Sequence, residues 1–81
     1  MNLNEFYHAA HHLVEAKQKR RISHDEMAES LGASTRAYAE WLKGGREPLA
    51  AYGAIRILAQ LDDADIVKIV REFVATKEKI G

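Results

Sequence analysis

Residues 22–42 carry the end signals of two short helices joined by a turn that contains one glycine. Ser23 and Glu26 have the spacing of a capping box, in which a serine and a glutamate three residues later satisfy free N–H groups at a helix start. Gly32 suits the left-handed position that ends many helices, and Ser34 is a preferred cap for the next one. Because only a tight turn fits between them, the sequence predicts two short helices packed at a steep angle.

Both helices carry apolar residues at spacings of three and four, as an amphipathic helix requires. The expected inner residues are Met27, Ala28 and Leu31 in the first helix and Tyr38, Trp41 and Leu42 in the second. We expect Trp41 to be largely buried between the two helices, with Met27 and Leu31 nearby. A helix pair joined by a glycine turn, with the second helix presented outward, is a helix-turn-helix.

The remaining sequence predicts three further helices, over residues 3–20, 49–61 and from Asp62 or Asp63 to Ile80. No segment alternates as a strand would. The apolar residues that define these helices are Leu3, Phe6, Tyr7, Ala10, Leu13 and Val14, then Ala51, Ile55, Leu58 and Leu61, then Ile66, Val67, Ile69, Val70, Phe73, Val74 and Ile80. The expected fold class is all-α, with five helices in one domain over residues 1–81.

Composition narrows the possible functions. The 81 residues allow one small domain, which buries only about 60% of its unfolded surface. Absence of cysteine excludes disulfides and thiolate zinc sites and fits a reducing cytosol. The polar N-terminal segment is unlike a signal peptide, and the most apolar stretch, residues 49–61, is too short to span a bilayer. The 12 basic and 12 acidic residues give zero net charge, which counts weakly against nucleic-acid binding.

Residues 22–48, ISHDEMAESLGASTRAYAEWLKGGREP, resemble the Cro and lambda-repressor-like helix-turn-helix family, also called the XRE family. The positions that match its pattern are Ser23, Ala28, Leu31, Gly32, Ser34, Trp41, Gly44 and Pro48. The departures are Tyr38 in place of a small aliphatic residue, Ala37 and Ala39 in place of polar residues, and His24 in place of a frequent glutamine. These departures affect which DNA sequence the protein would read, and they do not affect the expected fold. The resemblance implies a compact five-helix lambda-repressor-like domain, double-stranded DNA as partner, and a bacterial or phage protein of the cytoplasm.

The outward face of the second central helix supplies the candidate base-reading residues. With Tyr38 turned inward, the helical period places charged residues on the opposite side. Arginine can grip guanine with two hydrogen bonds, glutamate can accept from cytosine, and alanine can touch the thymine methyl group. The expected base-reading residues are Thr35, Arg36, Ala39, Glu40 and Lys43. The alternative is an ordinary solvated face, with one Arg36–Glu40 pair worth about 0.2–0.5 kcal/mol.

Phosphate contacts are expected to flank this helix. The candidate phosphate ligands are His24, Ser34, Arg46 and Tyr52, with Lys43 also able to reach the backbone. His24 begins a helix, where free N–H groups and the helix dipole attract anions, and the resemblance places its counterpart near the DNA backbone. Each of these residues also has an ordinary interpretation as a cap, a solvated side chain or, for Tyr52, a core residue.

The segment HAAHH invites a metal interpretation, because His8 and His12 have the i, i+4 spacing of two zinc ligands on a helix. A third ligand is not evident, and a solvent face opposite Phe6 and Leu13 is the favoured interpretation. We therefore expect no metal and no cofactor. No nucleophile–base pair, phosphate-binding loop or carboxylate pair stands out either, so we expect no enzymatic activity.

The last helix has an apolar stripe wider than the roughly 100° that packing onto one core needs. The excess residues suggest a second surface, and the resemblance agrees, because repressors of this family often dimerise through the last helix. The expected dimer interface is Val67, Val70 and Val74. The alternative is that one broad face packs entirely within the monomer.

Two function classes remain open. The first is a sequence-specific transcriptional regulator, a dimeric repressor or autoregulator that binds an inverted-repeat operator. The second is an antitoxin or antiactivator whose main role is to bind another protein. The five expected helices account for the sequence without a long tail of the kind that many antitoxins use to cover a toxin, which favours the first class.

Overall fold

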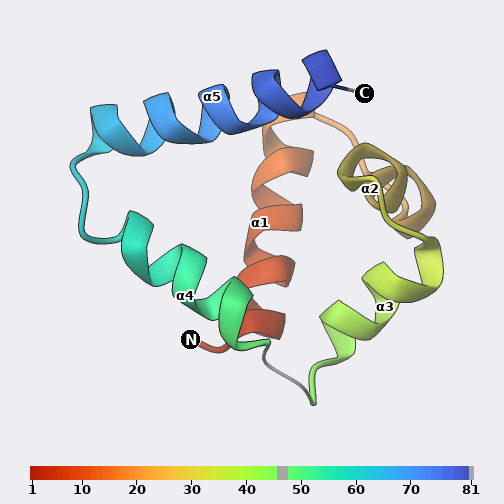
Figure 1. Cartoon of the computed structure of the whole chain (residues 1–81). Helices are drawn as coiled ribbons and strands as arrows, with labels where there is room; N and C mark the ends of the chain where they lie inside the picture. The colour runs from red at the N-terminus through yellow and green to blue at the C-terminus, as the bar shows by residue number, and fades with distance from the viewer. Residues whose placement is uncertain (46–47, 81) are drawn as a thin grey trace. The chain divides into compact units, whose positions relative to one another are not determined.

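The structure is a computed structural model that describes residues 1–45 and 48–80, with side chains for residues 1–45 and 48–76. The described residues form five α-helices and no strand, which confirms the predicted all-α class. In chain order the helices are α1 (Leu3–Gln18), α2 (His24–Leu31), α3 (Thr35–Lys43), α4 (Leu49–Leu58) and α5 (Asp63–Ile80) (Figure 1). The chain divides into two compact units, Met1–Glu47 and Pro48–Gly81.

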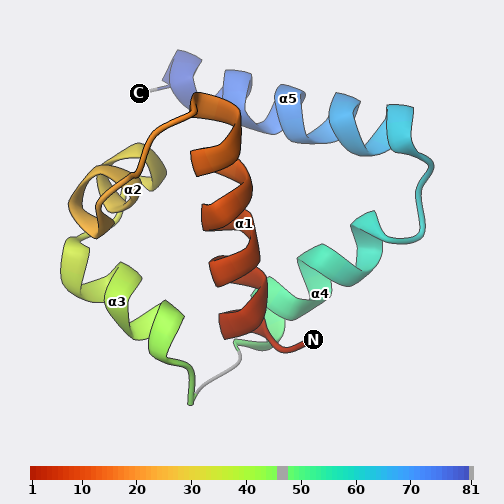
Figure 2. The ribbon, with the colours of Figure 1, turned by 180° about the vertical axis from the view of Figure 1, so that it is seen from behind.

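The first unit consists of α1 with the α2–α3 pair beside it. In both views α3 follows α2 on the same side of α1 (Figures 1 and 2), and α3 packs against both other helices. A capping box between Asn2 and Glu5 begins α1. The helix ends at Gln18, two residues before the predicted end, because Lys19 adopts the left-handed conformation with φ of 57° and donates its N–H to the carbonyl of Glu15.

The end signals of α2 and α3 are confirmed. Ser23 Oγ accepts the N–H of Glu26 at 3.1 Å, and Glu26 Oε1 accepts the N–H of Ser23 at 3.4 Å. Gly32 has a φ of 74°, a backbone conformation that residues other than glycine rarely adopt. Ser34 Oγ accepts the N–H of Ala37 at 3.0 Å and so caps α3. Local hydrogen bonds therefore fix the turn between the two helices.

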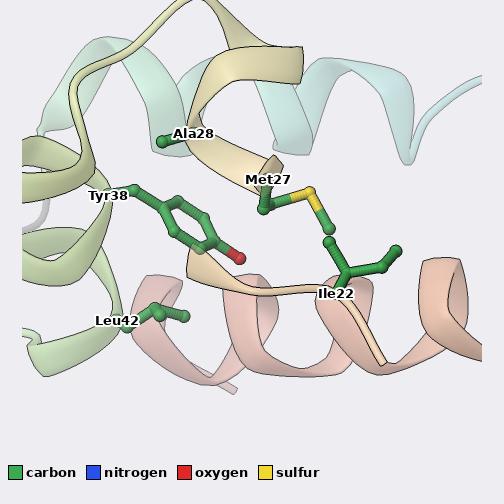
Figure 3. Close-up of a cluster of buried hydrophobic side chains, with 5 residues drawn as sticks. All are labelled: Ile22, Met27, Ala28, Tyr38 and Leu42. Atoms are coloured by element: carbon green, nitrogen blue, oxygen red, sulfur yellow. The ribbon is translucent and has the colours of Figure 1, made fainter. Parts of the chain in front are cut away.

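The core of the first unit surrounds Tyr38, which is only 1% exposed. Figure 3 shows its ring with Met27 and Ala28 of α2 on one side and Leu42 of α3 on the other. Ile22, in the segment between α1 and α2, completes the cluster, and Tyr7 and Val14 pack against it from α1. The predicted inner residues Met27, Ala28, Tyr38 and Leu42 are confirmed.

The predictions for two other inner residues of this helix pair, Leu31 and Trp41, were wrong. Leu31 is 52% exposed, because it is the last residue of α2 and lies where the chain leaves the helix. Trp41 is 37% exposed and so is not largely buried. Its ring stacks on Tyr7 of α1 with centroids 5.4 Å apart, and it meets the ring of Tyr38 edge-on at 6.2 Å. Trp41 therefore joins α3 to α1.

The predicted inward face of α1 was wrong in part. The residues that pack against the helix pair are Tyr7, His11 and Val14, with spacings of four and three, and Leu3 is buried as well. The prediction also placed Phe6 and Leu13 on the inward face, but Leu13 is 71% exposed. The prediction left out His11, which is buried and lies between Tyr7 and Val14 in the inward series.

The second unit contains α4 and α5. The first of these helices begins after Pro48 and ends at Leu58, three residues before the predicted end, because Leu61 N–H bonds the carbonyl of Leu58 in a turn. The later helix begins at Asp63, within the predicted start, and the carbonyl of Asp62 accepts the N–H of Ile66 at 3.0 Å. None of the α4 residues is fully buried, although Ala51, Ile55 and Leu58 are half-buried.

The apolar residues of α5 are largely open to solvent. Ile66 is half-buried, and the exposed members are Val67, Ile69, Val70, Phe73 and Val74. The side chain of Ile80 lies outside the described residues. No helix within the described part of the chain is long and apolar enough to cross a membrane.

Candidate nucleic-acid interface

One face of α3 collects the predicted base-reading side chains. All five, namely Thr35, Arg36, Ala39, Glu40 and Lys43, are exposed, while Tyr38 and Leu42 point into the core. Arg36 Nε lies 3.7 Å from Glu40 Oε1, an i, i+4 ion pair in solvent. The contact engages Nε, whereas a bidentate guanine contact can use the two terminal nitrogens of the guanidinium group. Glu40 can therefore orient Arg36 without consuming those donors.

Thr35 is tied to the preceding helix. Its Oγ1 donates to Asp25 Oδ1 at 2.5 Å, which joins the first residue of α3 to the first turn of α2. Because a carboxylate only accepts hydrogen bonds, this contact commits the hydroxyl proton of Thr35. The side chain then offers a methyl group and acceptor lone pairs to any ligand.

Two of the predicted phosphate ligands lie at helix starts in the first unit. Ser34 Oγ accepts the N–H of Ala37 and keeps its own proton, which can be donated to an anion. His24 is the first residue of α2, and its exposed ring lies edge-on to the rings of His11 and Tyr38, with centroids 5.9 and 5.8 Å away. The aromatic core therefore supports the orientation of His24.

The other predicted residues lie elsewhere. Tyr52 belongs to α4 of the second unit, where the guanidinium carbon of Arg56 lies 5.5 Å from its ring centroid. Arg46 lies outside the described residues. The dimer candidates Val67, Val70 and Val74 are exposed on α5. Among the candidate DNA contacts, the first unit thus brings together the α3 residues with Ser34 and His24.

A residue that sequence reasoning missed, His11, holds this arrangement to α1. Its Nδ1 lies 2.7 Å from the hydroxyl of Tyr38, and its Nε2 lies 2.8 Å from the carbonyl oxygen of Ile22. A carbonyl oxygen can only accept, so Nε2 carries the proton of the neutral ring and Nδ1 accepts the Tyr38 O–H. The spacing of His11 from Tyr7 and Val14 is the signal in the sequence that could have revealed it.

His8 and His12 are both exposed, as the solvent-face interpretation predicted, and each has a hydrogen-bond partner. His8 Nε2 lies 3.0 Å from the carbonyl oxygen of Leu42 and donates to it, which satisfies a carbonyl at the end of α3. His12 is open to solvent and lies 3.3 Å from Glu15 Oε1. Within the described residues no three histidine, cysteine, aspartate or glutamate side chains are placed to hold a metal ion.

Among the described residues of the first unit, three side chains have shifted pKa values. The Ile22 N–H, which Glu15 Oε2 accepts at 2.8 Å, lowers the pKa of Glu15, and the hydrogen bond with His12 adds to this. Burial raises the pKa of Tyr38, and the negative charge of Glu15 contributes. The hydrogen bond from Arg20 at 2.8 Å lowers the pKa of Glu26. The first unit thus keeps the two carboxylates charged and Tyr38 neutral.

Comparison with protein-family models, curated proteins and solved structures finds no match to this chain. The resemblance to the XRE family therefore rests on residues 22–48 themselves.

Proposed function

We propose that the chain is a sequence-specific DNA-binding transcriptional regulator of the lambda-repressor-like type, which inserts α3 into the major groove. The observation that carries the proposal is the division of α3 into a buried side, with Tyr38 and Leu42, and an exposed side, with Arg36 and Lys43. Two caps and a left-handed glycine hold this helix against α2. The major groove of B-DNA, about 12 Å wide, admits one such helix.

The exposed side chains divide into two roles. Arg36 reads a guanine edge, Glu40 orients it or accepts from a cytosine, and Ala39 and Thr35 touch thymine methyl groups. The phosphate ligands are His24, Ser34, Arg46 and Tyr52, with Lys43 at the end of α3. Because the net charge is zero, binding to random DNA is weak and specificity depends on the base contacts.

The proposed regulator is a homodimer, a repressor or autoregulator that binds an inverted repeat. Val67, Val70 and Val74 form the interface, because a two-fold axis makes one apolar patch complementary to itself. Two reading helices related by this axis match half-sites whose centres lie about 10 base pairs apart. The protein needs no cofactor and no catalytic group for this role, and it acts in the cytoplasm.

The exposed apolar side chains of the second unit favour one alternative function, that of an antitoxin or antiactivator. Leu49, Ile57 and Phe73 are exposed in addition to the three valines. A heterologous protein partner that covers them would make DNA binding secondary. Capture of a partner from extract of the native cell that survives nuclease treatment would favour this alternative, whereas capture that depends on DNA would favour the regulator.

The test begins with selection of bound duplexes from a random pool. Wild type, Arg36→Ala and Lys43→Ala are then titrated against the selected and a scrambled duplex at several salt concentrations. We expect Arg36→Ala to cost about 1–3 kcal/mol on the selected duplex and much less on the scrambled one. Lys43→Ala should weaken both alike and lower the salt slope by about one.

The matched control is Lys68→Ala, which removes the same charge from an exposed position on α5 and should leave the base preference unchanged. No enrichment in the selection would contradict the proposed function. Equal losses on both duplexes for Arg36→Ala would instead assign Arg36 to the phosphates.

A further inference from the structure

All four histidines of the chain line one cavity of the first unit. The cavity has a volume of about 510 Å³, and its walls include His8, His11, His12 and His24 together with Glu15 and Arg21. The side chain of His11 is 10% exposed, whereas that of His12 is 76% exposed. Three exposed histidine rings thus line the same cavity as one buried histidine, and the DNA-binding role does not use His11.

The hydrogen bonds of His11 require the neutral ring. Its Nε2 donates to the carbonyl of Ile22 at 2.8 Å, and its Nδ1 accepts the hydroxyl proton of Tyr38 at 2.7 Å. A second proton on the ring would turn Nδ1 into a donor. The hydroxyl of Tyr38 would then lose its acceptor inside the core, and a buried donor without a partner is strongly unfavourable.

We propose that this contact makes the packing of α3 on α1 sensitive to acid. When His11 takes up a proton, the hydrogen bond from Tyr38 breaks, and α3 loses one of the hydrogen bonds that attach it to α1, while the contact of His8 with the carbonyl of Leu42 remains. Histidine side chains in general change charge between pH 5 and 8, so this is the range in which the proposal is tested.

Some of the groups that face His11 favour a positive charge on its ring, and others oppose it. On α1, Glu15 Oε2 lies 3.6 Å from Nε2 and favours the charged ring. This carboxylate is already shared, because Oε2 accepts the N–H of Ile22 and Oε1 lies 3.3 Å from His12. On α2, His24 lies 5.9 Å from the His11 ring, and on α1 His12 lies 6.4 Å away. When these two rings charge in the same cavity as Arg21, they oppose a positive charge on His11.

The fluorescence of Trp41 can report a loss of packing between α3 and α1. Trp41 is the single tryptophan of the chain, and it stacks on Tyr7 at the contact between α1 and α3. Urea unfolding of the full chain is followed by its fluorescence at several pH values from 7.5 to 5.5. This range stays above 4.5, the ordinary value of the glutamate pKa, so the carboxylates do not dominate the result.

We expect the unfolding equilibrium constant of wild type to rise as the pH falls, by up to about tenfold for each pH unit when one proton is taken up on unfolding. His11→Asn keeps an acceptor near Tyr38 but cannot titrate, so it should remove this pH dependence. His12→Asn, the neighbouring and exposed position, is the matched control and should retain it.

A wild type whose stability does not change over this range would overturn the proposal. Equal pH dependence in wild type and His11→Asn would also overturn it, as would its loss in His12→Asn. If His11→Asn does not fold at pH 7.5, the ring nitrogens of wild-type His11 are followed by NMR. We expect Nδ1 to be unprotonated at pH 7.5 and to gain a proton as the protein is destabilised, and a proton on Nδ1 at pH 7.5 would contradict the proposal. None of these measurements depends on DNA binding.

Discussion

At the scale of single residues, Tyr38 is the centre of the first unit and predicts a loss of stability in alkali. Its ring is buried, and burial raises its pKa above the ordinary value of 10.0. A tyrosine whose pKa is raised in the folded state favours folding fully below pH 10 and loses that contribution as the pH rises through the folded-state value. We therefore expect the free energy of unfolding to decline above pH 10.

Tyr38→Phe tests the origin of this decline by urea unfolding at pH 7 and above pH 10. At pH 7 the variant should be less stable by about 1 kcal/mol, because Nδ1 of His11 loses its donor. Above pH 10 the difference from wild type should shrink, since phenylalanine cannot ionise. A variant that loses as much stability in alkali as wild type would show that other groups cause the decline.

At the scale of helices, the end of α1 predicts a stabilising substitution. Lys19 is the non-glycine residue with positive φ among those described, and the left-handed conformation costs a residue with a side chain about 1–2 kcal/mol. Lys19→Gly should remove this cost and stabilise the protein by up to about 1 kcal/mol. The net gain is smaller because glycine also raises the conformational entropy of the unfolded chain. Lys17→Gly, inside the last turn of the same helix, should instead destabilise by about 1 kcal/mol. Thermal melts compare the two, and a loss of stability in both would contradict the argument.

At the scale of helices, the helix ends could be predicted from the sequence, whereas contacts between distant helices could not. The ends of α2 and α3 were predictable because a cap is a contact among neighbours, such as Ser23 with Glu26. The spacing of His11 from Tyr7 and Val14 indicated the inward side of α1, but the hydrogen-bond partners of His11 were not predictable, because Ile22 and Tyr38 lie 11 and 27 residues away. Trp41 was misplaced for the same reason, since its stacking partner Tyr7 lies on a distant helix. The exposed face of α3 followed from the helical period once Tyr38 was known to be buried.

At the scale of the whole molecule, assembly is the remaining property that the proposed function requires. The second unit leaves its apolar residues open, with Val67, Val70 and Val74 exposed on α5. An exposed apolar patch of this kind is typical of an interaction surface. Under the proposal, a second copy of the chain covers the three valines and thereby spaces the two reading helices for one turn of DNA.

Val74→Glu tests this assembly. Because Val74 is exposed, glutamate causes no burial of charge within the chain, and the variant should keep the helical circular dichroism of wild type. Two facing copies would bring the two new carboxylates together at the axis, and like charges in a dry interface are strongly unfavourable. We expect sedimentation to give a dimer for wild type and a monomer for Val74→Glu, with much weaker binding to the inverted repeat.

Thr76→Glu is the matched control, because it adds the same charge two residues later on a different face of the helix. It should stay dimeric and bind DNA as wild type does. A dimer in both variants would place the interface elsewhere. A wild type that sediments as a monomer at high concentration without DNA would remove the basis for the assembly altogether. In that case any spacing of half-sites found by selection would have to come from the DNA bringing two chains together, and binding would depend on the square of the protein concentration.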